Sequence, residues 1–148
     1  MTLRDYRPAD FATLCEIDRT CFPPGVAYPP QDLAYWLRQP GAFAMVAEDE
    51  QQGRVAGFVL ARALATHGGH IVTIDLLPEY RRGGLGTELM ERAHARLKEM
   101  GAQRVRLETS VENAAAIAFF NRLGYQATRL IPRYYLNRIN AWEMTREL

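Results

Sequence analysis

The glycine-rich segment Arg81-Arg82-Gly83-Gly84-Leu85-Gly86 places the strongest constraint on what this chain can fold into. It follows a strand-like run that ends at Pro78, and it opens a helical pattern over residues 84–100. Glycines allow positive φ angles, so the backbone N–H groups of such a turn can point at one object, and the helix N-terminus adds about half a positive charge. The segment therefore predicts an anion site, and a pyrophosphate fits it. A plain tight turn with solvated arginines is the alternative.

Two common nucleotide-binding motifs do not fit this turn. No Gly-Lys-Ser/Thr follows it, as a P-loop requires, and the spacing of Gly83, Gly84 and Gly86 differs from the GxGxxG of dinucleotide folds. The turn favours a ligand that carries phosphates without Mg²⁺-nucleotide chemistry.

The patterns on either side of the turn predict one α/β (α+β) domain over residues 1–148. The expected strands are residues 2–6, 43–47, 55–65, 70–77, 105–108, 125–130 and 141–145, and the expected helices are residues 8–21, 30–39, 84–100 and 114–123. A loop of tyrosines and arginines is expected between the last two strands. This order predicts a mixed, mostly antiparallel sheet of six to seven strands with about four helices on its faces. The ligand is expected at the carboxyl ends of the strands, where residues 78–86 and 109–113 leave the sheet.

Composition excludes several classes of partner. Eighteen basic against seventeen acidic residues leave a net charge of +1, far from the basic excess that nucleic acid would require. No run approaches the ~18 apolar residues of a membrane span and no signal peptide is present, so we expect a cytoplasmic protein with no membrane partner. Cys15 and Cys21 match no redox or zinc spacing and are expected to be free thiols. His67 and His70 flank glycines more typical of a hairpin turn than of a metal pair, so no metal is predicted.

Two elements of the sequence resemble the GNAT superfamily of acetyltransferases. Its signature, Arg/Gln-x-x-Gly-x-Gly/Ala after a strand that ends in proline, is similar to residues 76–86. A second element, an asparagine followed by alanines and an aromatic-Asn-x-x-Gly-aromatic ending, is similar to residues 113–125. The two elements stand at the right separation, and the likeness extends over essentially the whole chain. The resemblance implies a GNAT-like fold and an enzyme that transfers the acetyl group of acetyl-CoA to a primary amine.

The resemblance also implies which residues hold acetyl-CoA. Amides from Arg82 to Thr87 would hold the CoA pyrophosphate, and the main chain of Leu76 and Leu77 would pair with the pantetheine arm. Asn113 would contact that arm, although it also fits a plain helix cap, and both roles can coexist. The expected cofactor-binding residues are Leu76, Leu77, Arg81, Arg82, Gly83, Gly84, Leu85, Gly86, Thr87, Asn113, Ala116, Phe119 and Phe120.

Attack of an amine on a thioester needs a neutral amine, a donor for the oxyanion and a proton for the leaving thiolate. Glu108 stands where a related group of N-terminal acetyltransferases carries a glutamate, and it is the expected base. A solvated carboxylate at a strand end is the alternative. The family's usual oxyanion donor is a backbone amide near Leu77.

The sequence departs from the family at the residue that would supply the proton for the leaving thiolate. Many members place a tyrosine where this chain has Phe120, which has no proton to give. Tyr125, Tyr134, Tyr135 or water could protonate the thiolate, with water favoured, or the enzyme could be slow and rely on the thiolate being a tolerable leaving group. Among side chains, Tyr134 joins Glu108 as the second expected catalytic residue.

The acceptor is expected to be a protein or peptide N-terminus. Phe22 and Pro23 between the first helices, and Tyr134 with Tyr135 before the last strand, resemble acetyltransferases that modify protein N-termini, including the ribosomal-protein type. These four are the expected substrate-binding residues, although residues 140–144 depart from the acidic-Ala pattern of those enzymes. A small-molecule amine and a non-catalytic acyl-CoA-binding module remain as alternatives, and the sequence leaves both a monomer and a homodimer open.

Overall fold

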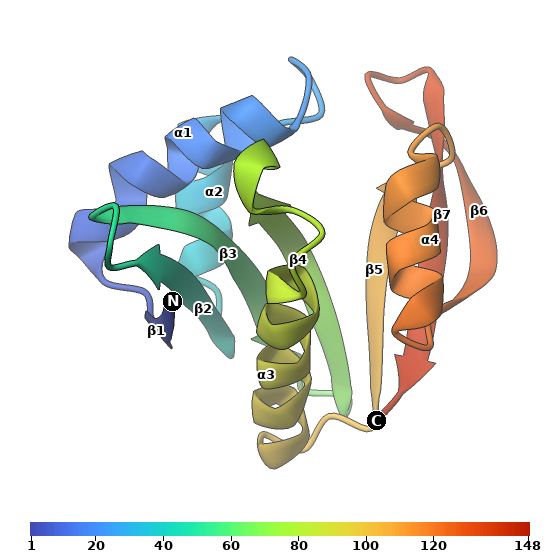
Figure 1. Ribbon diagram of the computed structural model, residues 1–148. Helices are drawn as coiled ribbons and strands as arrows, with labels where there is room; N and C mark the ends of the chain where they lie inside the picture. Colours follow the sequence, from blue (N-terminus) through green and yellow to red (C-terminus); the bar gives the residue numbers. More distant parts are fainter.

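Short runs of alternating or wholly apolar residues form seven strands that join in one sheet. The computed structural model describes residues 1–148. The strands are β1 (Thr2–Asp5), β2 (Ala42–Asp49), β3 (Arg54–Ala63), β4 (Gly68–Leu76), β5 (Arg104–Ser110), β6 (Gln126–Tyr135) and β7 (Ile139–Glu147). They lie in the order β1-β2-β3-β4-β5-β7-β6, and every neighbouring pair is antiparallel except β4 and β5. The predicted mixed, mostly antiparallel sheet is confirmed (Figure 1).

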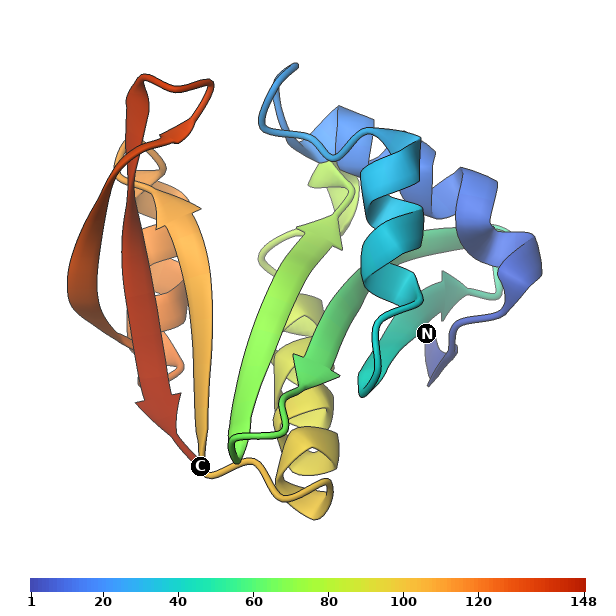
Figure 2. The same ribbon diagram turned by 180° about the vertical axis from the view of Figure 1, so that it is seen from behind.

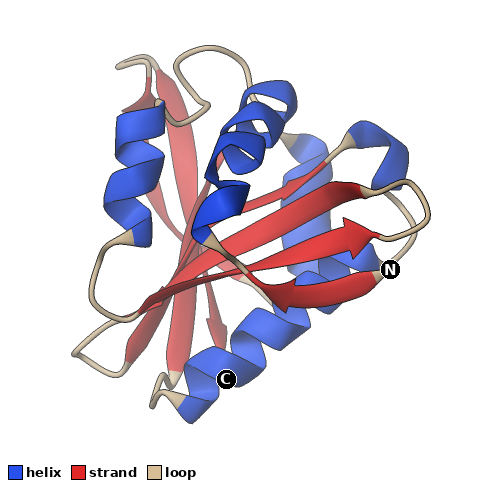
Figure 3. Cartoon of the chain, turned by 90° about the vertical axis from the view of Figure 1, so that its left-hand side faces the viewer, coloured by secondary structure: helices blue, strands red, loops and turns tan.

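Four helices cover the two faces of this sheet. They are α1 (Phe11–Cys21), α2 (Pro30–Leu37), α3 (Leu85–Glu99) and α4 (Ala114–Arg122). Figure 2 shows α1 and α2 in front of the sheet and α3 and α4 behind it, and Figure 3 shows helices on both sides of the sheet. Each face has its own apolar core, since one buried cluster joins α3 and α4 to the sheet and a second joins α1 and α2 to it.

Local sequence determines where the helices begin and end. Pro30 occupies the first turn of α2, where its missing N–H costs nothing. Gly101 and Gly124 follow α3 and α4 with φ angles of 99° and 92°, which a residue with a side chain adopts only under strain.

No helix is both long and apolar enough to cross a membrane.

Strands β4 and β5 pair only at their first residues. Gly68 to His70 lie opposite Arg104 to Arg106, and no pairing continues beyond them. The two ribbons diverge toward their carboxyl ends in Figures 1 and 2. Beyond these residues, the backbone edges of β4 and β5 face each other without hydrogen bonds between them. This is the end of the sheet where the sequence predicts the ligand.

The hairpin of β6 and β7 is longer than predicted. Residues 131–135, expected as loop, belong to β6, and Tyr135 lies opposite Ile139. The register shifts between Ile131 and Tyr135, where Arg133 has a φ of 54° and donates its N–H to the side-chain oxygen of Asn140 at 3.0 Å. This bulge lets the strand continue past Pro132, and it brings the tyrosines to the diverging ends of β4 and β5.

Candidate active site

The glycine-rich turn presents a row of free backbone donors. Arg82 and Gly84 have φ angles of 68° and 86°, and Gly84 directly precedes α3. None of the backbone N–H groups from Arg82 to Thr87 finds an acceptor within the protein. A side chain at Gly83 or Gly84 would meet no other atom within 4 Å, so the surface over these amides is open. A left-handed turn with unpaired donors at a helix N-terminus fits a diphosphate.

Gly86 joins three elements at this turn. A Cβ placed on it would lie 3.1 Å from Leu76 Cδ1 and 3.2 Å from Phe119 Cζ. The end of β4, the first turn of α3 and the middle of α4 therefore meet at Gly86, and three of the predicted cofactor residues, Leu76, Gly86 and Phe119, lie together. Asn113 caps α4 through a hydrogen bond from the Ala116 N–H to its side-chain oxygen at 3.1 Å.

Phe120 lies deeper than the other residues predicted for the cofactor arm. Only 6% of it is exposed, and its ring packs against Phe119 at 5.3 Å and Tyr125 at 5.9 Å. Tyr125 is 1% exposed and bonds to His94 at 2.7 Å, among the residues of α3. Phe120 carries no proton, and the Tyr125 hydroxyl is paired with His94 of α3.

The backbone at the end of β4 narrows which amide near Leu77 is free to be the oxyanion donor. The Leu77 N–H donates to the Ala56 carbonyl at 2.9 Å, so it is already used. Antiparallel ladders alternate, so the N–H of Leu76 points to the opposite edge, toward β5. The Leu76 carbonyl accepts from Cys21 Sγ at 3.2 Å and from Arg81 Nε at 2.9 Å.

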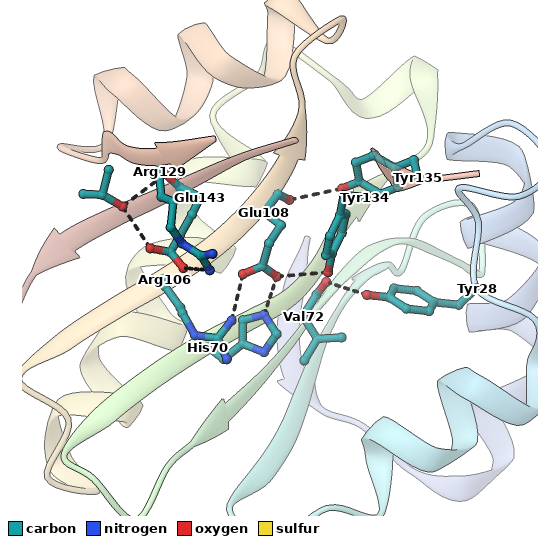
Figure 4. Close-up of polar contacts among 10 residues, drawn as sticks. Tyr28, His70, Val72, Arg106, Glu108, Arg129, Tyr134, Tyr135 and Glu143 are labelled. Carbon is teal, nitrogen blue, oxygen red and sulfur yellow. Dashed lines mark hydrogen bonds and ion pairs between the residues drawn. The ribbon is translucent and has the colours of Figure 1, made fainter. Parts of the chain in front are cut away.

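Glu108 lies at the centre of a polar cluster between β4 and β5 (Figure 4). Its side chain is 9% exposed, and its Oε1 lies 2.8 Å from His70 Nε2 while its Oε2 accepts from Arg106 Nη1 at 2.7 Å. An ionised carboxylate only accepts, so His70 Nε2 carries the hydrogen of this bond. Glu108 is thus a buried, partnered carboxylate and not the solvated strand end that the sequence left as an alternative.

The charge of Glu108 follows from these contacts. Burial works to raise the pKa of Glu108, but the hydrogen bonds from His70 and Arg106 and the electrostatic attraction of these two side chains outweigh it and hold that pKa below its usual range. Glu108 is therefore ionised at neutral pH.

Three tyrosines lie around Glu108, and one of them contacts its carboxylate. The Tyr134 hydroxyl lies 3.5 Å from Glu108 Oε1, and the Tyr135 hydroxyl lies 3.5 Å from the Glu108 carbonyl oxygen. The two rings pack edge to face at 4.8 Å. Tyr28 reaches the Val72 carbonyl at 3.4 Å from the other side (Figure 4). Burial and the charge of Glu108 raise the pKa of Tyr134 to about 12, so its hydroxyl keeps its proton at neutral pH.

The two loops with the predicted substrate residues meet each other. Phe22 is half-buried and Pro23 is exposed, both in the loop between α1 and α2. A Cβ on Gly25 of this loop would overlap the side chain of Leu136, which lies in the turn between β6 and β7. Phe22 and Pro23 make no polar contact with the tyrosines, and the contact between the loops is apolar.

His70 is the site residue that the sequence did not identify. It is 5% exposed, and its ring also packs edge to face against Trp36 of α2 at 5.8 Å. One signal could have found it, since His70 is the only polar residue in the first half of an otherwise apolar strand. Its partner is 38 residues further along the chain, so the pairing could not be predicted.

Comparisons with known proteins identify the family of this chain. Residues 11–125 match the Acetyltransferase (GNAT) family. The chain is 35% identical over 112 residues to N-alpha-acetyltransferase 30 of Schizosaccharomyces pombe, covering 73% of each chain. It is 29% identical to an N-alpha-acetyltransferase of Sulfurisphaera tokodaii, covering 99% of this chain and 92% of that one. The structure of Ard1 from Thermoplasma volcanium superposes with a TM-score of 0.87 at 25% identity, covering 99% of this chain and 97% of that one.

The family match spans well over half of the chain. The chain belongs to the GNAT family and is an acetyl-CoA-dependent N-acetyltransferase.

Proposed function

We propose that the chain acetylates the α-amine of protein N-termini, with Glu108 as the base that receives the amine's proton. The relatives from S. pombe and S. tokodaii carry the name N-alpha-acetyltransferase, and the second of these is matched along almost the whole chain. The single observation that carries the proposal is the largely buried carboxylate of Glu108, held by His70 and Arg106 between the diverging strands β4 and β5.

The free amides from Arg82 to Thr87 are suited to hold the diphosphate of acetyl-CoA. They are pre-oriented by two left-handed residues and need not give up any protein partner. The edge of β4 at Leu76 then faces the pantetheine arm. Acetyl-CoA supplies the acetyl thioester when it is bound.

The weak basicity of Glu108 suits an α-amine better than a lysine. A typical α-amine has a pKa near 7.8, so about a third of it is neutral at pH 7.5, whereas about one lysine side chain in a thousand is neutral. A carboxylate with a lowered pKa attracts an ammonium group strongly but removes its proton poorly. Glu108 can therefore orient an α-ammonium and take its proton directly or through water, while a lysine would remain charged.

His70 and Tyr134 complete the proposed proton chemistry. His70 Nε2 fixes Glu108 Oε1 at 2.8 Å and holds the carboxylate toward the site. Tyr134 keeps its proton at neutral pH and lies at the same carboxylate, so it can donate to the leaving thiolate. The N–H of Leu76, on the edge that faces β5, is the proposed donor for the oxyanion.

Release of free thiol from acetyl-CoA tests this proposal with a panel of acceptors. The panel holds peptides with a free N-terminus, the same peptides with a blocked N-terminus and an internal lysine, and small amines such as polyamines and amino acids. Thiol release is expected with the free N-termini alone. Release only with small amines would replace the proposed acceptor, and CoA binding by calorimetry with no acceptor-dependent thiol would leave a binding module.

A further inference from the structure

Two buried carboxyl groups lie side by side beneath the end of β4. Asp18 of α1 is fully buried and Asp75 of β4 is 1% exposed. Asp18 Oδ2 accepts the Tyr28 N–H at 2.6 Å, and Asp75 Oδ1 accepts the Thr73 hydroxyl at 2.5 Å. The other oxygen of each group, Asp18 Oδ1 and Asp75 Oδ2, has no partner, and the two side chains lie within hydrogen-bonding reach of each other.

Nothing around the pair neutralises two negative charges. The titratable groups that face it are the thiols of Cys15 and Cys21 on α1, the phenol of Tyr28 in the loop after α1, and the guanidinium of Arg81. Arg81 gives its Nε hydrogen to the Leu76 carbonyl and not to either carboxylate. No group of three or more acidic, histidine or cysteine side chains could hold a metal ion here.

Two ionised carboxylates at this position would leave two acceptors facing each other without a hydrogen. Burial and the neighbouring Asp18 raise the pKa of Asp75 well above its usual range. One proton gives Asp75 Oδ2 a hydrogen to donate to Asp18 Oδ1, and both unpartnered atoms are then satisfied.

We propose that Asp18 and Asp75 share one proton, and that this proton fastens the loop between α1 and α2 to the end of β4. Asp18 is tied to that loop through the Tyr28 N–H, and the Tyr28 hydroxyl reaches Val72 beside the Glu108 cluster. Asp75 immediately precedes Leu76 at the edge that faces the thioester. The pair is thus a positioning device for the acceptor side of the site, and this second part rests on the proposed function.

A shared proton makes a specific prediction about pH. The folded chain keeps one proton that a typical unfolded aspartate loses near pH 4. Between that pH and the raised pKa of Asp75 in the folded chain, the folded state binds one proton more than the unfolded state. Stability is therefore lost as pH rises through this window, and the unfolding equilibrium constant gains about tenfold per pH unit.

Urea unfolding of the wild type, Asp75→Asn and Asp32→Asn at a series of pH values from 5 to 8 measures this proton. An asparagine at position 75 can accept from Thr73 with its oxygen and donate to Asp18 with its amide, so it keeps both contacts without a titrating proton. Asp32 is exposed, which makes Asp32→Asn the matched control. We expect Asp75→Asn to lose the tenfold-per-unit dependence and Asp32→Asn to retain it. Parallel curves for the wild type and Asp75→Asn would overturn the shared proton, and Asp18→Asn, with the same expectation, decides the question if Asp75→Asn does not fold.

Steady-state kinetics with a peptide acceptor test the positioning role. Asp75→Leu removes the hydrogen bond to Asp18 at similar volume, and it is expected to raise the peptide KM at least severalfold while the acetyl-CoA KM stays within twofold. Asp75→Asn is expected to restore the wild-type peptide KM. An unchanged peptide KM in Asp75→Leu would contradict the fastening of the loop. If the wild type acetylates no peptide, the proposed function fails, while the unfolding curves still decide whether the proton is shared.

Discussion

Replacement of Glu108 by glutamine tests whether Glu108 is the base that receives the proton of the amine. The variant keeps an oxygen that can accept from His70 Nε2, and it loses only the charge and the ability to take a proton. Arg106 loses its partner, but its side chain is 39% exposed and can turn to water, so we expect the fold to be retained.

The expected loss of kcat depends on how much of the amine is already neutral and on how much a general base contributes. General-base catalysis contributes about 10²-fold to 10⁴-fold. Because about a third of a typical α-amine is already neutral at pH 7.5, we expect the low end, a loss of about 100-fold in kcat, which equals about 2.7 kcal/mol of transition-state stabilisation. The KM for acetyl-CoA is expected to stay unchanged, since the free amides from Arg82 to Thr87 are untouched.

Thiol release at a series of pH values measures both quantities. The rate of Glu108→Gln should rise with pH as the free amine loses its proton in solution. Glu143→Gln is the matched control, because Glu143 lies directly opposite Glu108 on β7 and pairs with Arg129 instead. A Glu108→Gln variant with wild-type kcat would remove Glu108 from the mechanism, and equal losses in both variants would point to a general change in charge.

Three further predictions concern the turn, the acid and the N-terminal ion pair. Gly84→Ala forces a side chain into a left-handed conformation, which costs about 1 kcal/mol and should weaken CoA binding in calorimetry, whereas Gly53→Ala, at a φ of 64°, should destabilise the fold without changing CoA affinity. Tyr134→Phe should lower kcat by no more than about 100-fold, because a thiolate is a tolerable leaving group, and an unchanged kcat would leave water as the acid. The hydrogen bond from Arg4 holds the pKa of Asp10 below its usual range, so the folded state releases that proton more easily and stability falls as pH drops through and below about 4. Asp10→Asn should therefore show a shallower loss of stability in acid unfolding curves, and an equal slope would refute that assignment.

The anion-binding turn could be predicted because its determinants are local. Glycines that accept positive φ angles and the first turn of α3 lie within a few residues of each other, so the sequence alone indicates where free amides gather. The helix boundaries were predictable for the same reason, since Pro30, Gly101 and Gly124 act on their immediate neighbours.

The end of β6 could not be predicted from its own residues. Pro132 and the neighbouring arginines and tyrosines show no alternation, and the strand continues only because β7 pairs with it across a bulge. The local sequence therefore predicts a loop over residues 131–135, where pairing with β7 forms a strand instead. The same pairing brings Tyr134 to Glu108. From the sequence, both residues could be assigned to the site only through the resemblance to the family.

The buried polar pairs depend on contacts between distant segments. His70 and Asp75 both lie in β4, a strand that reads as largely apolar, and their partners Glu108 and Asp18 come from β5 and α1. Neither pairing has a local signature. The contacts with His70 and Arg106 that keep Glu108 ionised likewise depend on how β4 and β5 are arranged.

The position of the acetyl group on one peptide tests the central claim most directly. A peptide with a free N-terminus and an internal lysine would be incubated with the enzyme and acetyl-CoA, and fragment-ion mass spectrometry would locate the added acetyl group. The buried, weakly basic carboxylate of Glu108 predicts acetylation of the α-amine with the lysine left free. Acetylation of the lysine would contradict this claim. So would a peptide that stays unmodified under conditions in which the enzyme releases thiol with a small amine.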